Sequence, residues 1–223
     1  MALFVRNSFS ERLQYLPIFP LPDTVLIPGA LLSLQVVDSR HHRLVQDCLA
    51  SDRLLAVVLL APPWSKGGLA ICRTAGLGYI QSHEQLDDGR LLVLVEGRMR
   101  ARILEELPGP EPYLVARAAL VEEEIDTSLG EIFASTQALR QLVLQLTRAI
   151  PDGSGETLAV TCAAEQDPGR LADLIAATLL SDPLQRQRYL EEPNVVRRLD
   201  FMVAIVAQVI RVLGVVDAGS LPS

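Results

Sequence analysis

The sequence contains a single lysine, Lys66, and this scarcity argues against two kinds of chemistry. A phosphate-binding P-loop requires an upstream glycine and a serine or threonine directly after the lysine, whereas Lys66 is followed by Gly67. A Ser–Lys catalytic dyad would also have to use Lys66. Proline and glycine lie close to Lys66, so no rigid element is expected to desolvate it and lower its pKa. Neither ATP hydrolysis nor Ser–Lys proteolysis is predicted.

Cysteine and histidine are scarce as well. Cys48, Cys72 and Cys162 form no C-x-x-C pair, which argues against a zinc site and a disulfide framework. The three histidines form no H-E-x-x-H motif, and the adjacent His41 and His42 would point about 100° apart on a helix. For His41, a half-buried ring on a helix face is therefore favoured over a base or a ligand. We expect no catalytic residue, no metal ligand and no cofactor.

Positive charge is in deficit, with 20 basic and 27 acidic residues and a net charge of −7. Residues 1–126 carry 12 basic and 16 acidic side chains, and residues 127–223 carry 8 and 11. Because neither part is basic, bulk charge argues against a nucleic-acid-binding surface.

Long uninterrupted apolar runs are also missing. The most hydrophobic late run, Met202–Val216, contains Gln208 and Arg211 and falls short of the roughly 18 apolar residues that a membrane-spanning helix needs. The N-terminal residues lack the basic start, apolar core and cleavage site of a signal peptide. These absences predict a cytoplasmic protein with no membrane partner.

The first half of the sequence has the pattern of β-strands. Leu16–Val37 is almost wholly apolar but holds four prolines, which predicts two or three short strands with a bend at Gly29. Leu54–Ala61 is an apolar run of strand length, typical of a strand buried on both faces. Further strands follow as far as about residue 123, with a turn at Asp87–Gly89.

Helix start signals occur once in the first half and repeatedly in the second. Asp38 or Ser39 is placed to cap a short helix with a buried stripe. Ser128 and Glu131 form a capping box, which predicts a helix that continues to Ile150. Further helix starts are predicted at Asp167-Pro168, Asp182-Pro183 and Asn194, and the last helix is expected to end at Gly214.

These patterns predict an α+β protein with two subdomains. The β-rich subdomain is expected to span residues 10–124, and the helical bundle residues 127–215. Residues 1–9 and 216–223 are expected to be flexible tails.

Several motifs follow one another in a specific order along the chain. They are L-P-I-F-P-L-P (Leu16–Pro22), V-L-I-P-G (Val25–Gly29), L-S-L-Q-V-V-D-S-R-H-H-R-L-V (Leu32–Val45), G-L-G-Y-I (Gly76–Ile80), V-E-G-R-M-R-A-R-I (Val95–Ile103), P-Y-L-V-A-R (Pro112–Arg117) and R-Q-R-Y-L-E-E-P-N-V-V-R-R-L (Arg186–Leu199). In this order they resemble the N-terminal, substrate-binding domain of Lon proteases, and the resemblance covers about Leu16 to Val212. The positions taken as structural signatures of the family are Pro17, Phe19, Pro20, Leu21, Pro28, Gly29, Arg40, Gly89, Gly97 and Tyr113.

The resemblance implies a PUA-like pseudo-barrel followed by a helical bundle. It also implies a non-catalytic module that binds unfolded or exposed polypeptide segments, or a protein partner. Because neither an ATPase nor a protease motif is present, we expect a stand-alone protein that resembles this domain, acting as an adaptor or a holdase.

Two features are candidates for partner binding. Trp64 lies in the segment Ala61–Gly68, which has paired prolines and paired glycines, where it is either a local packing residue or a contact residue. Arg98, Arg100 and Arg102 alternate as in a strand and would share one face. That face is either solvated and balanced by nearby acidic residues, or it contacts phosphate or an acidic partner. The second possibility, together with the implied PUA-like fold, leaves RNA binding as the alternative function.

Overall fold

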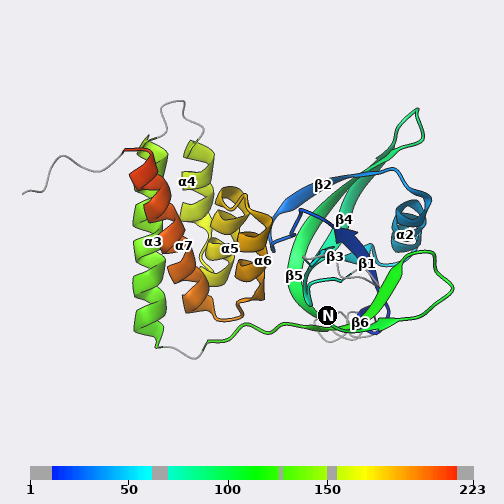
Figure 1. The fold of residues 1–223 in the computed structure, drawn as a ribbon. Helices are drawn as coiled ribbons and strands as arrows, with labels where there is room; N and C mark the ends of the chain where they lie inside the picture. Colours follow the sequence, from blue (N-terminus) through cyan, green and yellow to red (C-terminus); the bar gives the residue numbers. More distant parts are fainter. Residues whose placement is uncertain (1–11, 62–69, 126–127, 150–154, 215–223) are drawn as a thin grey trace, which may run out of the picture. The chain divides into compact units, whose positions relative to one another are not determined.

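The computed structural model describes residues 12–61, 70–125, 128–149 and 155–214. The chain forms two compact units (Figure 1). The strand unit comprises Met1–Glu122 and Leu180–Glu191, and the helical unit comprises Glu123–Leu179 and Glu192–Ser223. None of the described helices is long and apolar enough to cross a membrane.

The strand unit is a small barrel with one added strand. Its strands are β1 (Leu16–Leu21), β2 (Leu31–Val36), β3 (Leu54–Leu59), β4 (Thr74–Gln85), β5 (Leu91–Leu107) and β6 (Leu114–Leu120). The sheet has the order β2-β5-β4-β3-β1-β6, and β6 also pairs with β5, so five strands close into a ring. One edge of β5 pairs first with β2 and then with β6. This arrangement confirms the predicted fold class.

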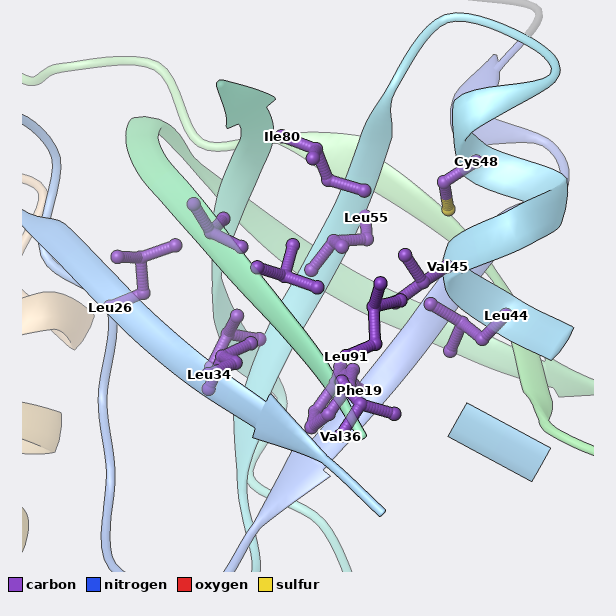
Figure 2. Close-up of a cluster of buried hydrophobic side chains, with 13 residues drawn as sticks. Phe19, Leu26, Leu34, Val36, Leu44, Val45, Cys48, Leu55, Ile80 and Leu91 are labelled. Atoms are coloured by element: carbon purple, nitrogen blue, oxygen red, sulfur yellow. The ribbon is translucent and has the colours of Figure 1, made fainter. Parts of the chain in front are cut away.

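The strand β3 is buried along its whole length, as its uninterrupted apolar sequence predicts. Its side chains alternate between two core clusters: Leu55 and Val57 belong to one, and Ala56 and Val58 to the other. Figure 2 shows the first cluster, in which side chains from the strands meet side chains from helix α2 (Ser39–Leu49). Each fully buried large apolar side chain stabilises the fold by roughly 1.5–3 kcal/mol.

Helix α2 begins where the sequence predicts. The carboxylate of Asp38 accepts hydrogen bonds from the amides of Arg40 and His41, both at 3.0 Å. This N-cap orients the helix so that Leu44, Val45 and Cys48 enter the first core cluster (Figure 2). Burial raises the pKa of the Cys48 thiol to about 12.

Close backbone approach explains two glycines of the barrel, Gly76 and Gly97, and a positive φ explains a third, Gly29. The segment between β1 and β2 crosses β4 and β5 so closely that a Cβ at Gly76 would overlap the carbonyl of Leu26, and one at Gly97 would overlap that of Ile27. The bend predicted at Gly29 is present, with a φ of 81° that favours glycine. Glycine at positions 76 and 97 therefore lets the crossing segment lie directly on β4 and β5.

The helical unit contains α3 (Leu129–Ala149), α4 (Gly155–Ala164), α5 (Pro168–Leu179) and α7 (Val195–Val212). The capping box is confirmed, because the Ser128 amide donates to the Glu131 carboxylate at 3.1 Å and the Glu131 amide to the Ser128 hydroxyl at 3.3 Å. Asp167 caps α5 by accepting from the Arg170 amide at 2.8 Å. Helix α4 was not predicted, because its exposed and buried residues follow no clear apolar stripe.

A buried cation lies in the middle of the helical unit. Arg198 of α7 has no exposed side-chain surface and forms ion pairs with Asp173 of α5, at 2.7 Å, and with Glu123. Gly169 leaves room for this cluster, since a Cβ there would meet the Glu123 carboxylate and the Arg198 guanidinium. A charge in a low-dielectric interior needs such partners, so the three residues fix α5, α7 and the segment before α3 together.

The structure corrects one element of the predicted subdomain ranges. Helix α6 (Pro183–Glu191) lies within the range expected for the bundle but belongs to the strand unit. The Gln187 side-chain amide donates to the Thr74 carbonyl at 3.0 Å, and the Arg186 guanidinium donates to the Val25 carbonyl at 3.2 Å. Leu190 packs with Val25 in a small apolar cluster. These long-range contacts have no local sequence signal.

Candidate functional site

The three arginines of β5 do not share one exposed face. Gly78 of β4 pairs with Gly97, and Leu77 pairs with Met99, so Arg98 is an extra residue in β5. Such a β-bulge interrupts the alternation of side chains along a strand. The predicted common face assumed an unbroken period of two, and the bulge makes that prediction wrong.

Arg100 is instead a structural residue. Only 5% of it is exposed. Its Nε donates to the Leu190 carbonyl at 3.2 Å, and its guanidinium lies 5.7 Å from the ring centroid of Tyr189. Both partners belong to α6, so Arg100 holds that helix on the strand unit and is not presented to a phosphate.

Arg98 and Arg102 remain on the surface. Arg98 pairs with Glu96 at 2.8 Å and lies over the ring of Tyr79 at 5.3 Å. Arg102 is exposed and pairs in the sheet with Thr74. The expectation of a solvated face balanced by nearby acids fits Arg98, and a partner-binding role for either residue stays a prediction.

Trp64 and the predicted tails lie outside the described residues. Of the signature positions, Phe19 is a core residue that stacks on His41 with ring centroids 4.3 Å apart. The other positions occupy β1 (Pro17, Pro20 and Leu21), the turn before β2 (Pro28 and Gly29), α2 (Arg40), the β4–β5 turn (Gly89, with a φ of 85°), β5 (Gly97) and the segment before β6 (Tyr113). Most of these positions serve the fold.

Three signature positions come together at a pocket of about 470 Å³ in the strand unit. Pro20, Arg40 and Tyr113 line it together with Pro108 and Pro112 of the segment before β6. The Tyr113 hydroxyl donates to Asp47 at 2.8 Å, and burial together with this carboxylate raises the pKa of Tyr113. The lining is largely apolar, and because it holds both Arg40 and Glu111 it favours no ligand of one charge.

A larger apolar groove of about 520 Å³ lies between α3 and α4 in the helical unit. Its apolar lining includes Leu129, Ile132, Phe133, Val143, Leu144, Ala159, Cys162 and Ala163. Although it lines this groove, Phe133 is 66% exposed, and Leu129 and Leu144 are exposed as well. Large apolar side chains gathered in one groove are unusual on a monomeric surface and typically mark a binding site. The sequence predicts a helix over this segment but gives no signal for the groove.

The charged side chain that lines the groove, Arg140, is already engaged. The Arg140 guanidinium donates to the carbonyls of Cys162 and Glu165 at the C-terminal end of α4. Burial raises the pKa of the Cys162 thiol to about 11, so this thiol is neutral at physiological pH. Among the described residues, no group of three or more His, Cys, Asp or Glu side chains is placed to hold a metal ion. The groove is therefore suited to packing with apolar groups.

Comparison with known proteins identifies the class of the fold. The structure is similar to the N-terminal domain of the Mycobacterium avium complex Lon protease, with a TM-score of 0.69 at 20% identity over 87% of this chain and 98% of that one. It is also similar to a Lon N-terminal domain protein from Xanthomonas campestris, with a TM-score of 0.60 at 22% identity over 86% of this chain and 98% of that one. Both comparisons confirm the α+β fold.

The sequence places the chain in the family. Residues 15–208 match the family model of the ATP-dependent protease La (LON) substrate-binding domain, and the chain belongs to this family. It is 32% identical to the Lon protease of Roseiflexus castenholzii over 189 residues, 83% of this chain and 23% of that protein. It is 29% identical to the Lon protease of Dictyoglomus thermophilum over 212 residues, 95% of this chain and 26% of that protein. The chain thus spans about a quarter of these relatives.

Proposed function

We propose that this chain binds exposed apolar segments of unfolded polypeptides and does not hydrolyse them. The observation that carries the proposal is the groove between α3 and α4, where exposed Phe133 and Leu129 border buried Val143. The family description as a substrate-binding domain supports it, and the match covers no catalytic region of the relatives.

An apolar occupant fits the groove better than a charged one. An aromatic or branched side chain inserted there would remove Phe133 and its own apolar surface from water, at roughly 25 cal/mol per Å² buried. Arg140 already donates to the carbonyls of Cys162 and Glu165 and so adds no free cation for an acidic ligand.

The RNA-binding alternative has no supporting observation. It required Arg98, Arg100 and Arg102 on one strand face, and Arg100 is buried beneath α6. A salt-dependent RNA affinity would be needed to revive it.

The proposal is tested with Phe133→Ser and the matched control Val160→Ser. Phe133 lines the groove, whereas Val160 is similarly exposed, at 69%, on α4 outside it. The probe is a reduced, carboxymethylated protein that is permanently unfolded, and its affinity is measured by fluorescence anisotropy. We expect Phe133→Ser to weaken binding at least tenfold and Val160→Ser to leave it within twofold.

Equal affinity of the two variants would show that the groove is not the binding site. Absence of binding by the unmodified chain would overturn the proposed function itself. Cleavage of the probe by the purified chain, with or without ATP, would overturn the non-catalytic part, and a Lys66→Ala variant would show whether Lys66 is responsible.

A further inference from the structure

The strand β2 has one edge that no described strand covers. It pairs with β5 along its whole length, from Leu31 opposite Glu96 to Val36 opposite Leu91. The ring of the barrel closes without it, and in the described part of the chain β2 has no second strand neighbour. Unpaired backbone groups along such an edge form a template for another strand.

The alternation of backbone hydrogen bonds between β2 and β5 shows which residues of β2 direct their amides and carbonyls to this edge. The Gly97 amide donates to the Ala30 carbonyl at 2.9 Å, just before β2 begins. Since bonded and non-bonded pairs alternate in an antiparallel ladder, Leu32 and Leu34 direct their backbone groups toward β5. Ser33 and Gln35, and Leu31 before them, direct theirs to the free edge.

Within Leu31–Val37, the described strand and its last flanking residue carry none of the sequence devices that protect natural edge strands. From Leu31 to Val37 there is no charged residue and no proline, and the register with β5 shows no bulge. Leu31 is 65% exposed and Val37 is 70% exposed, so apolar side chains flank the polar Ser33 and Gln35. Charge therefore does not prevent an approaching strand from pairing here.

The strand unit offers an internal contrast. The distal part of β4, Gln81–Gln85, also has an edge without a described strand partner. Its other edge pairs with β5, but β3 pairs only with Gly76–Tyr79 of β4 and does not reach this part. Every residue of that distal part is exposed, and it carries Glu84 and His83. Polar and charged residues protect one edge in the expected way, and the β2 edge is left without them.

We infer that the free edge of β2 takes up an extended segment of the bound polypeptide as an additional strand. This inference rests on the proposed function and adds the mode of recognition. An edge strand recognises backbone donors and acceptors, so it accepts many sequences but excludes segments rich in proline. At about 3.3 Å per residue, the six residues of β2 would pair with a segment of similar length.

The first experiment removes one edge donor. Ser33→Pro deletes an amide that the ladder with β5 does not use, and proline is tolerated at such edge positions. His83→Pro is the matched control, because it removes an amide at the free edge of β4. The Leu86 amide donates to the Arg90 carbonyl at 2.8 Å. Since bonded and non-bonded pairs alternate along the ladder with β5, the His83 amide points away from β5. The probe is an acetylated hexapeptide of alternating threonine and valine. We expect at least tenfold weaker binding for Ser33→Pro and less than a twofold change for His83→Pro.

The second experiment leaves the protein unchanged, so it remains decisive if Ser33→Pro does not fold. Two N-methylated versions of the hexapeptide, each methylated at alternate residues, are compared with the unmethylated peptide. We expect one of them to lose binding at least tenfold. With the unmethylated peptide bound, hydrogen exchange of the Ser33 and Gln35 amides should slow at least tenfold, and that of the Leu34 amide should not change.

Three results would overturn the inference. One is equal binding of all three peptides, and another is failure of the hexapeptide to bind the unmodified chain. The third is protection of Ser33 and Gln35 that grows with protein concentration in the absence of peptide, together with a dimer in sedimentation, because a second copy would then cover the edge. If Ser33→Pro still captures the unfolded protein while Phe133→Ser does not, the proposed function stands and the β2 inference fails.

Discussion

The two units of this chain leave different chemical groups open at their surfaces. The strand unit buries apolar side chains on both faces of β3 and leaves the backbone edge of β2 without a strand partner among the described residues. The helical unit satisfies its backbone within its helices and leaves apolar side chains, such as Phe133, exposed in a groove. A backbone edge recognises extended conformation, whereas an apolar groove recognises side chains. Under the proposed function, the two surfaces would recognise different features of a bound polypeptide.

The units also differ in what holds them together. The strand unit depends on apolar packing and close glycine contacts, and the helical unit is centred on the buried Arg198 with its two carboxylates. This difference can be tested by substitutions that are expected to destabilise one unit, each compared with a control substitution that is expected to have little effect or to stabilise.

The largest effect is expected for Arg198→Met in the helical unit. Removal of the cation leaves the Asp173 carboxylate buried without its main partner, and breaking a buried pair in this way costs about 3–5 kcal/mol. The neighbouring Arg197→Met is the control, because Arg197 is exposed and its pair with Glu192 spans 4.0 Å, which predicts a change of about 0–1 kcal/mol. Urea unfolding measures both. Similar stabilities of the two variants would show that the ionic cluster is not structurally important.

Gly76→Ala should have the next largest effect and should act on the strand unit. Its Cβ would overlap the Leu26 carbonyl, and overpacking of this kind typically costs about 1–3 kcal/mol. The control is Gly130→Ala in α3, where the nearest atom is the Ser128 hydroxyl oxygen at 3.9 Å and helix propensity predicts a gain of up to about 1 kcal/mol. Thermal unfolding should therefore shift in opposite directions. A stabilising Gly76→Ala would contradict the close approach.

A smaller effect is expected from alkaline pH. Cys48 and Cys162 have pKa values raised to about 12 and about 11 by burial, from 9.0. Between pH 9 and 10 the unfolded thiols lose their protons while the folded ones keep them, so the unfolded state is favoured. The free energy of unfolding should fall by about 1 kcal/mol for each thiol per pH unit. Urea unfolding at pH 8, 9 and 10 measures this, and Cys48→Ala should remove part of the slope. A pH-independent stability would contradict both shifts.

The local elements were predictable because their signals lie close together in the sequence. The Asp38 cap, the capping box of Ser128 and Glu131, and the positive φ of Gly29 and Gly89 each depend on a few adjacent residues. The apolar run of β3 predicted burial on both faces for the same reason. Family membership followed from the order of the motifs, and the comparisons confirm it.

The candidate surfaces were not predictable in the same way. The bulge at Arg98 breaks the assumed alternation, and the packing of α6 on β5 buries Arg100, which was expected at the surface. The stripe of α3 that contains Phe133 has the spacing of a core face, and only the packing of α4 leaves part of it as a groove. Periodicity shows that a face is apolar but not whether another element covers it.

The sequence by itself determined most of the elements, several of their caps, the fold class and the family, because those depend on local patterns and on motif order. Only the tertiary structure decided that Arg100 and α6 hold one another, that Phe133 stays exposed and that no described strand pairs with the outer edge of β2. The reason is physical, because barrel closure and helix packing bring together residues that are far apart in the chain. Which side chains and which strand edge stay exposed therefore depends on the packing of all the other elements.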